Sequence, residues 1–262
     1  MNRTAGMIAL TALTLAPAHG QETLAPAHGQ DSRAEAQRVL VVVAHPDDEL
    51  FMAPAIAALA RQGAQVTIIH ATSGDAGPGV SSLTPGEELG RVRAMEAFCS
   101  VNALGATSSV QFDLGDGTLG LDAHHPGSPA RQLVSRLGGH LAQVSLVLTW
   151  GPDGGYGHAD HRMVSALATQ VVQAMPDAER PRLLYVGIPA GGRPPVPEMA
   201  EWAVTDPALL TEAIAYTPAD LAAAQAAAQC HVTQFDEATR AGMMPLFGAT
   251  MWQGKVHFRP AF

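Results

Sequence analysis

Two short clusters of imidazole and carboxylate groups contain the residues best suited to chemistry. The first spans residues 44–49 (AHPDDE) and the second spans residues 157–161 (GHADH). The three consecutive carboxylates of the first cluster repel one another unless something cationic lies close to them. A bound metal is the simplest neutraliser, and two histidines with one carboxylate form the ligand set of a hydrolytic zinc site. The two clusters together therefore predict a metal centre that activates water.

Each cluster follows an apolar run that is typical of a buried strand. Residues 39–43 (VLVVV) precede the first cluster, and residues 144–150 (VSLVLTW) precede the second. In open parallel sheets, ligands bind beyond the carboxyl ends of the strands. We therefore expect both clusters on the same rim of one sheet.

Strand and helix patterns alternate along the rest of the chain. The predicted strands are 38–44, 65–71, 109–114, 144–150, 183–188 and, at a candidate sheet edge, 252–258; the predicted helices are 54–61, 84–104, 129–141, 160–174 and 218–234. Asp160 is the expected N-cap of the fourth helix. In the second helix, Arg93 and Glu96 are able to pair beside an apolar stripe that includes Met95 and Phe98. The alternation predicts a single doubly wound, Rossmann-like α/β domain over 36–262 with a mostly parallel sheet.

The two motifs, taken together, resemble the PIG-L/LmbE-like family of zinc-dependent N-deacetylases. This family includes the GlcNAc-phosphatidylinositol deacetylases and the mycothiol-pathway deacetylases, and the similarity runs from about residue 38 to the end of the chain. The resemblance implies that His45, Asp48 and His161 ligate Zn²⁺ and that Asp47 is the general base. It also implies that His158 polarises the carbonyl or stabilises the oxyanion, with Asp160 fixing its ring.

Elementary chemistry agrees with these roles. Zinc lowers the pKa of a bound water to ~7, and a general base for the water proton contributes ~10²–10⁴-fold to such a reaction. A cationic His158, kept charged by Asp160, suits an oxyanion. Tyr156 precedes the second motif and could add a phenolic donor, or it could pack on the rim of the sheet.

Weaker signals surround the two motifs. By the same resemblance Asp75, Arg93 and Asp116 contact the substrate, although a solvated ion pair or a turn is an equal interpretation for each. We interpret His231 as structural support for the rim and Glu49 as a residue that orients its neighbours. Residues 115–120 match GxGxxG, but no helix pattern follows them, so we reject a dinucleotide site.

The N-terminal residues look like a targeting segment. An apolar run over 7–15 follows Arg3, and small residues follow that run, which is typical of a secretory signal peptide cleaved near 18–29; a disordered Ala-rich tail is the alternative. We assign 1–35 to this signal peptide and a linker, and expect an exported protein, periplasmic or secreted, without a stable membrane anchor. Cys99 and Cys230 then either pair or lie buried separately.

The composition limits the partners. The formal net charge is −9 with no block of basic residues, which argues against nucleic acid. We expect an N-acetylated amino sugar of the N-acetylglucosamine type as the substrate. Two alternatives stay open: a hydrolase of another amide or amide conjugate, and a non-catalytic sugar-binding module on the same fold.

Overall fold

A seven-stranded sheet lies at the centre of the computed structural model, which describes residues 36–262. The predicted signal peptide and linker lie outside the described residues. The strands are β1 (Arg38–Val43), β2 (Gln65–Thr72), β3 (Ser108–Leu114), β4 (Leu146–Trp150), β5 (Arg182–Val186), β6 (Glu212–Ala215) and β7 (Lys255–Pro260). Their order is β3-β2-β1-β4-β5-β7-β6. The strands from β1 to β5 pair in parallel, and β7 is antiparallel to both β5 and β6.

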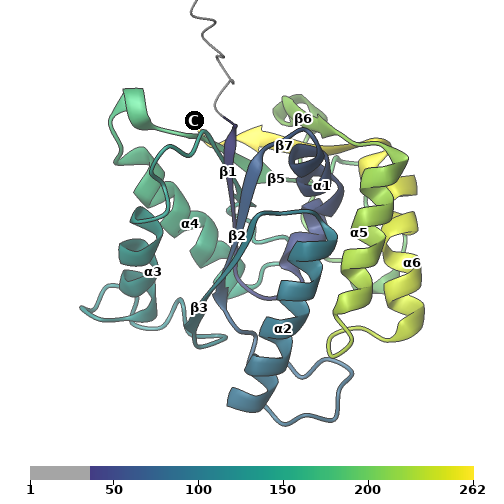
Figure 1. Cartoon of the computed structure of the whole chain (residues 1–262), viewed down its shortest axis with the longest axis horizontal. Coiled ribbons are helices and arrows are strands. Elements are labelled where there is room, and N and C mark those ends of the chain that lie inside the picture. Colours follow the sequence, from purple (N-terminus) through teal and green to yellow (C-terminus); the bar gives the residue numbers. More distant parts are fainter. Residues whose placement is uncertain (1–35) are drawn as a thin grey trace, which may run out of the picture. The chain divides into compact units, whose positions relative to one another are not determined.

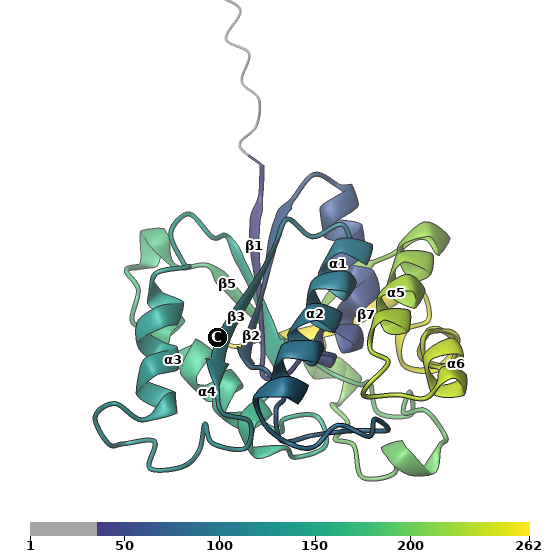
Figure 2. The same ribbon diagram turned by 60° about the horizontal axis from the view of Figure 1, so that its bottom comes forward.

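Helices cover both faces of this sheet, which confirms the expected doubly wound α/β class. They are α1 (Ala53–Arg61), α2 (Glu87–Ala103), α3 (Pro129–Gly138), α4 (Ala159–Gln173), α5 (Pro218–Cys230) and α6 (Glu237–Phe247). Helices α1, α2 and α5 lie on one side of the sheet, while α3 and α4 lie on the other (Figure 1, Figure 2). No helix within residues 36–262 is long and apolar enough to cross a membrane.

The alternation of side chains along β1 divides the core into two parts. Val39, Val41 and Val43 belong to the apolar cluster under α1 and α5, whereas Leu40 and Val42 belong to the cluster under α3 and α4. Because both faces of β1 are buried, its sequence is a continuous apolar run. The strand is therefore held firmly up to the residue at which the first motif begins.

The C-terminal third differs from the sequence-based expectation. Strand β7 is not at an edge, because the unpredicted strand β6 pairs with its outer side. Strand β6 has only four residues (EAIA), too few for a clear alternation. Helix α6 was also missed, since Gly242 and Pro245 lie inside it and both disfavour helix interiors.

Helix α2 buries only part of the predicted apolar stripe: Ala97 and Val101 are buried as expected, but other members are not. Met95 and Phe98 are 62% and 53% exposed, while Arg93 and Glu96 are buried. The expected pairing of Arg93 with Glu96 is wrong, because Arg93 donates to main-chain carbonyls and Glu96 accepts hydrogen bonds from Thr233. Charged residues occupy the buried face because each finds fixed hydrogen-bond partners there.

Cys99 and Cys230 form a disulfide that connects the end of α2 to the end of α5. Their Cα atoms are 5.8 Å apart, although 131 positions separate them in sequence. This decides between the two alternatives that the sequence left open. The bridge holds α2 and α5 together on the side of the sheet where α1 also lies.

Candidate active site

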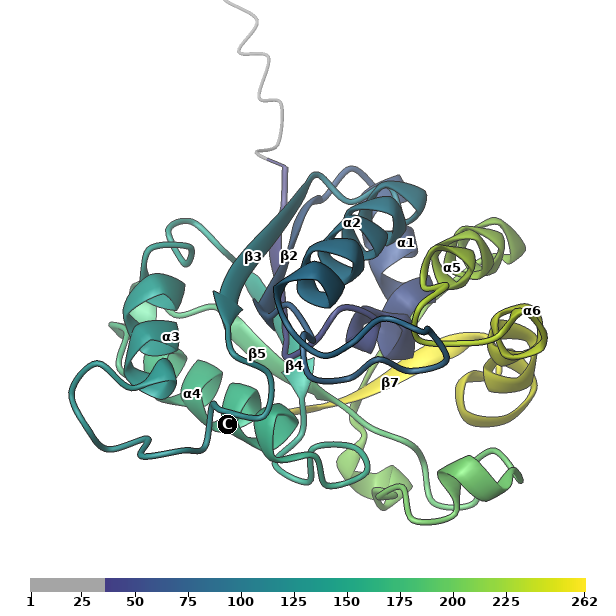
Figure 3. The same ribbon diagram turned by 90° about the horizontal axis from the view of Figure 1, so that it is seen from below.

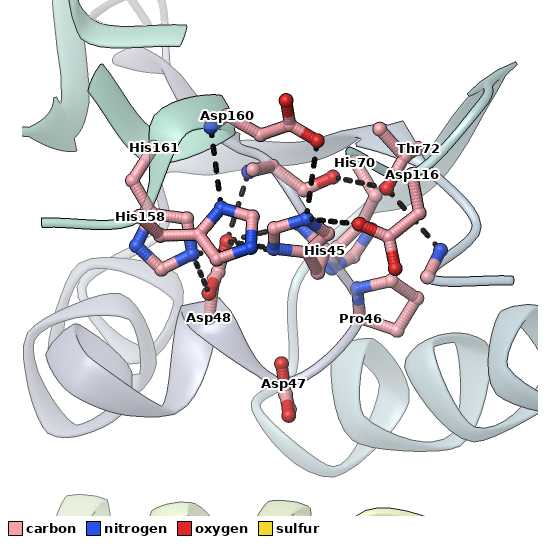
Figure 4. Close-up of polar contacts among 12 residues, drawn as sticks. His45, Pro46, Asp47, Asp48, His70, Thr72, Asp116, His158, Asp160 and His161 are labelled. Carbon is pink, nitrogen blue, oxygen red and sulfur yellow. Dashed lines mark hydrogen bonds and ion pairs between the residues drawn. The ribbon is translucent and has the colours of Figure 1, made fainter. Parts of the chain in front are cut away.

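The two sequence motifs meet at the carboxyl ends of β1 and β4. His45 follows β1 by two residues, Asp48 begins the short helix η1 (Asp48–Met52), and His161 lies in the first turn of α4. His45 Nδ1 is 3.2 Å from His161 Nε2, and His161 Nε2 is 3.0 Å from Asp48 Oδ1. Asp48 Oδ2 lies 3.6 Å from His45 Nδ1. The three side chains thus point toward one another (Figure 4), although they come from separate parts of the chain.

The hydrogen-bond partners of the two histidines define which nitrogen is available as a metal ligand. His161 Nδ1 lies 3.1 Å from the carbonyl oxygen of Gly154, which can only accept, so this nitrogen carries the proton. His45 Nε2 lies 2.9 Å from Asp116 Oδ1 and 3.5 Å from Asp160 Oδ2, an ion-pair arrangement in which the N–H is not well aligned with either oxygen. The proton of a neutral His45 ring therefore belongs on Nε2, beside the two carboxylates. In the neutral rings, both remaining lone pairs face the centre of the cluster.

Asp48 adds a third acceptor to the same centre. Its Oδ2 accepts hydrogen bonds of 2.9 Å from the main-chain N–H groups of Ala44 and His45, which leaves Oδ1 directed at His161. Burial raises the pKa of Asp48, but His161 and His45 outweigh this effect and hold the pKa well below its ordinary value. Three acceptors that converge without a donor between them fit a cation. The donor set, two imidazoles and a carboxylate, fits zinc.

Two overlapping groups of ligands are possible around His45. Donor atoms of His45, His158 and His161 lie within 4.8 Å of one another, and so do those of His45, Asp116 and Asp160. In the second group Asp160 uses both oxygens to accept main-chain N–H groups, from Gly117 at 2.7 Å and from Leu119 at 3.1 Å. The second group is therefore a hydrogen-bonded support for His45, and the candidate metal position is the one on the Nδ1 side. Burial lowers the pKa of His45, yet Asp116, Asp160 and Asp48 together raise it well above its ordinary value, so positive charge is favoured here.

Asp47 lies next to a candidate ligand but points elsewhere. Its backbone is left-handed, with φ 105°, which turns its side chain away from Asp48 and toward the cavity described below. The carboxylate is 13% exposed and lies 3.4 Å from Nη2 of Arg93. Burial raises the pKa of Asp47 to about 6, even though Arg93 opposes the rise. A carboxylate with a raised pKa beside a metal position is suited to accept and return a proton.

Glu49 holds the turn at Asp47 through a hydrogen bond to the main chain. It is fully buried, and its Oε2 accepts from the main-chain N–H of Asp47 at 3.0 Å and contacts His70 Nε2 at 3.1 Å. Its Oε1 accepts from Ser100 Oγ and contacts His231 Nε2. Burial raises the pKa of Glu49, but His231 and His70 outweigh it, so the group stays ionised.

Sequence reasoning missed two of these four partners. His70 lies in β2 opposite Val43 of β1, so the register of the two strands places it beside the first motif. That register follows from pairing two adjacent parallel strands, which is the one signal that points to His70. Ser100 carries no such signal, because a serine inside a helix is ordinary.

The expectation that Asp160 is the N-cap of α4 and fixes the ring of His158 is wrong. His158, not Asp160, is the N-cap of α4, and its Nδ1 accepts the main-chain N–H of Asp160. The Asp160 carboxylate instead binds the 117–119 loop, as described above. Burial and the neighbouring histidines lower the pKa of His158 below its ordinary value, which favours the neutral ring over the expected cation. A neutral His158 with Nδ1 as the acceptor carries its proton on Nε2, where it can donate.

Tyr156 and the three predicted substrate-binding residues occupy different positions. Tyr156 is 49% exposed, its ring lies 5.2 Å from that of His161, and burial with nearby carboxylates raises its pKa, so its hydroxyl stays protonated. Arg93 donates to the carbonyls of Pro46, Gly74 and Gly77, Asp75 accepts from the main chain of Asp116, and Asp116 accepts from that of Ala76. These contacts tie the loops after β1, β2 and β3 together. Whether Asp75, Arg93 or Asp116 contacts a substrate stays a prediction.

A cavity of about 660 Å³ opens directly beside the cluster. Its polar end includes Asp47, Asp48, Tyr156 and His161. The rest of its wall comes from η1, Trp150 of β4, the loop after β5, residues 234–236 and helix α6, and it includes the carboxylates of Glu198 and Asp236. Seen from the end of the sheet, the loop after β2 also crosses toward α5 and α6 (Figure 3), and Val80 from this loop lines the cavity.

The match to a known family agrees with this geometry. The PIG-L family, described as GlcNAc-PI de-N-acetylase, matches residues 40–172, a range that contains both motifs. The chain belongs to this family. The expectation raised by the motifs is therefore confirmed at the level of the family.

Curated relatives of the chain are deacetylases. The chain is 30% identical to 1D-myo-inositol 2-acetamido-2-deoxy-alpha-D-glucopyranoside deacetylase from Rhodococcus erythropolis over 203 residues, which are 70% of this chain and 66% of that protein. It is 34% identical to the enzyme of the same name from Streptomyces avermitilis over 168 residues, which are 56% of this chain and 57% of that protein. The chain thus spans between about half and two thirds of the length of these relatives.

Solved structures with the same fold have different activities. N,N'-diacetylchitobiose deacetylase from Pyrococcus horikoshii superposes with a TM-score of 0.63 at 19% identity, covering 86% of this chain and 84% of that one. GalB, the 4-carboxy-2-hydroxymuconate hydratase from Pseudomonas putida KT2440, gives the same TM-score and identity and covers 86% of this chain and 96% of its own. At such low identity these structures establish the fold, and the chemistry must be argued from the site.

Proposed function

We propose that this chain is a zinc-dependent N-deacetylase that removes the acetyl group from an N-acetylglucosamine-type amino sugar. The observation that carries the proposal is the convergence of His45 Nδ1, His161 Nε2 and Asp48 Oδ1 next to the carboxylate of Asp47. The named activity of the curated relatives supports the choice of an acetylated glucosamine as the substrate.

The roles of the residues follow from their positions. His45, Asp48 and His161 would hold the zinc, which supplies a water of pKa ~7 and polarises the amide carbonyl. The Asp47 carboxylate accepts a proton from the attacking water. It then returns that proton to the amide nitrogen, which leaves as an amine.

His158 and Tyr156 supply neutral donors to the carbonyl oxygen as negative charge develops on it. The Nε2–H of His158 and the hydroxyl of Tyr156 are the donor groups. Neutral donors still stabilise an oxyanion, so the correction to the charge of His158 leaves its proposed role intact. Arg93 keeps Asp47 in place through its contact with the carboxylate and its hydrogen bond to the carbonyl oxygen of Pro46.

The test is metal analysis of the purified protein combined with acetate release from a panel of N-acetylated sugars. We expect one zinc per chain, acetate and free amine from at least one N-acetylglucosamine derivative, and loss of both products after removal of the metal. Zinc with no acetate from any sugar, but hydrolysis of other amides, would favour the other-amide alternative. Sugar binding without any hydrolysis would favour the non-catalytic module.

We also propose that the protein is exported. The apolar run over 7–15 and the small residues after it support this, and the disulfide is consistent with an oxidising compartment. N-terminal sequencing of protein recovered from the periplasm or medium tests it, with a new terminus near residues 18–29 as the expected result. An intact Met1 on cytoplasmic protein would contradict it.

A further inference from the structure

The loop after β2, residues 73–86, forms one side of the cavity. Val80 from this loop lines the cavity and is 57% exposed. In Figure 3 the loop crosses toward the segment that joins α5 to α6. A surface loop keeps one conformation when other parts of the chain bind its main-chain groups, and otherwise it opens easily. The contacts of this loop therefore decide whether Val80 has a fixed position.

The second half of the loop is bound to Thr233, in the segment between α5 and α6. The main-chain N–H groups of Val80 and Ser81 donate to the carbonyl oxygen of Thr233, at 2.9 Å and 3.2 Å. Gly79 has a left-handed backbone with φ 55°, and a Cβ atom on it would lie 2.5 Å from that same oxygen and 2.6 Å from the Cα of Gln234. Only glycine therefore fits this contact without a shift of the loop.

Thr233 is itself held by a buried carboxylate of α2. Its main-chain N–H donates to Glu96 Oε1 at 2.8 Å, and its hydroxyl donates to Glu96 Oε2 at 2.6 Å. Thr233 and Glu96 are 5% and 6% exposed, so water has little access to either bond. Two parallel hydrogen bonds to one carboxylate fix the orientation of the donor as well as its distance. The carbonyl group that binds Val80 is thus fixed to α2.

The first half of the loop is bound to the same face of α2. Arg93, one turn before Glu96, donates to the carbonyl oxygens of Gly74 and Gly77 at 2.9 Å and 3.1 Å. Arg93 and Glu96 do not pair with each other. Instead, Arg93 binds one half of the loop directly, and Glu96 holds the other half through Thr233.

We infer that Val80 contacts the substrate, and that Thr233 and Glu96 are positioning residues that hold Val80 in the wall of the cavity. The inference rests on the proposed function, because it takes the cavity as the place where the substrate binds. Val80 has no group that can exchange a proton or bind a metal, so its contact with the substrate is the same before and during the reaction. Loss of such a contact raises KM and leaves kcat unchanged.

The first test moves the loop. Gly79→Ala adds a Cβ atom that meets main-chain atoms of Thr233 and Gln234, so the loop must shift. For the N-acetylglucosamine derivative that the wild type cleaves best, we expect KM to rise at least about tenfold, with kcat and zinc content within about twofold of wild type. Gly63→Ala is the matched control, because Gly63 also has a positive φ, 91°, but nothing lies within 4 Å of its Cβ position.

Two results of this test would overturn the inference. Equal effects of Gly79→Ala and Gly63→Ala would show that backbone strain alone is responsible. A fall in kcat at unchanged KM would show that the loop acts on Asp47, through the contact of Arg93 with that carboxylate, and not on the bound substrate.

The second test shortens the side chain that faces the cavity. Val80→Ala removes two methyl carbons and should raise KM about 3–10-fold, with kcat unchanged. Val232→Ala is the matched control, because Val232 is also an exposed valine, at 53%, and precedes Thr233 but does not line the cavity. Its KM should stay within about twofold of wild type. The same KM in Val80→Ala and wild type would remove Val80 from contact with the substrate.

The third test weakens the contact between Thr233 and Glu96. Thr233→Val keeps the shape of the side chain but leaves Glu96 Oε2 without its donor, whereas Thr233→Ser keeps the hydroxyl. Thr233→Val should raise KM and speed up hydrogen exchange at the amides of Val80 and Ser81, and Thr233→Ser should restore both toward wild type. If the two variants behave alike, the hydroxyl does not hold the wall.

Hydrogen exchange and binding separate this inference from the proposed activity. Exchange at the amides of Val80 and Ser81 reports the position of the loop without any substrate, and calorimetry of the zinc-loaded protein with N-acetylglucosamine reports binding without cleavage. Weaker sugar binding in Gly79→Ala and Val80→Ala, with no acetate released by the wild type, would retain the inference and reject the deacetylase. Acetate release with unchanged KM in both variants would retain the deacetylase and reject the inference.

Discussion

Ser100 and His231 meet on a single oxygen of Glu49. Ser100 Oγ lies 2.5 Å and His231 Nε2 lies 2.7 Å from Glu49 Oε1, although they come from α2 and from the end of α5. The other oxygen of the same carboxylate accepts from the main chain of Asp47. Two distant helices therefore set the position of the candidate general base through one buried carboxylate.

Replacement of Glu49 by Gln should reduce kcat about 10–100-fold, the range found when partners of a metal site are changed. Gln keeps the volume but loses the negative charge and one acceptor oxygen, so the turn at Asp47 is no longer held. Zinc content should stay close to one per chain, because the candidate ligands lie outside this contact. Complete loss of zinc would show that Glu49 supports the metal rather than Asp47.

The disulfide lies next to Ser100 and His231, the two residues that contact Glu49 Oε1. Cys99 directly precedes Ser100, and Cys230 directly precedes His231. In the chain-entropy model a loop of this length contributes ~4–5 kcal/mol. We expect the Cys99→Ala/Cys230→Ala variant, or reduced wild type, to lose up to this free energy of unfolding in urea. Activity should also fall under conditions in which the reduced protein is still folded. Unchanged activity in the folded, reduced protein would mean that packing alone holds Ser100 and His231.

Asp220 should make stability depend on pH at the acidic end. It is almost fully buried, and the side-chain hydrogen bond from Arg61, followed by those from Thr217, lowers its pKa to about 2. Its folded pKa lies below its unfolded value of ~3.9, so its contribution is present above pH ~4 and is lost as the pH falls toward 2. Because Arg61 is 47% exposed, we discount the effect to about 1–2 kcal/mol. Asp220→Asn should lower the free energy of unfolding by this amount at pH 6, and the difference from wild type should shrink by pH 3.

Asp47→Asn should retain zinc while turnover falls ~10²–10⁴-fold. The amide cannot accept the water proton, but it fits the same turn and leaves His45, Asp48 and His161 unchanged. Asp122→Asn serves as the control, because Asp122 is an exposed carboxylate with 76% of its side chain accessible. Loss of zinc together with activity in Asp47→Asn would identify Asp47 as a ligand.

The sequence predicted most of the sheet and the meeting of the two motifs, for a physical reason. Strands β1 and β4 are buried on both faces, so their apolar runs are unambiguous, and parallel pairing then brings the residues after them to one rim. Strand β6 and helix α6 were not predicted, because their local sequence propensity is weak and tertiary contacts stabilise them instead. As a result the sequence did not show that α6 lines the cavity beside the cluster.

The sequence indicated which residues lie near one another better than it indicated which of them form hydrogen bonds. Asp160 and His158 both lie close to His45, a candidate metal ligand, but their contact with each other depends on a turn whose geometry the sequence does not specify. A helix N-cap accepts main-chain N–H groups, and either residue was chemically able to take that position. Arg93 and Glu96 illustrate the same limit, since their i,i+3 spacing allows a pair that stronger partners elsewhere replace.

The position of Asp160 leads to a prediction that separates its two proposed roles. Both of its oxygens accept main-chain N–H groups, from Gly117 and Leu119. The same loop contains Asp116, whose Oδ1 lies 2.9 Å from His45 Nε2. Asp160→Asn places an NH₂ group against one of these N–H groups, at a cost of about 1–3 kcal/mol in the free energy of unfolding. Because the support of His45 is disturbed, zinc affinity should fall about 10–100-fold. If Asp160 acted instead on the ring of His158, the zinc-loaded variant would bind metal like the wild type and lose only kcat, so a titration of zinc affinity decides between the two.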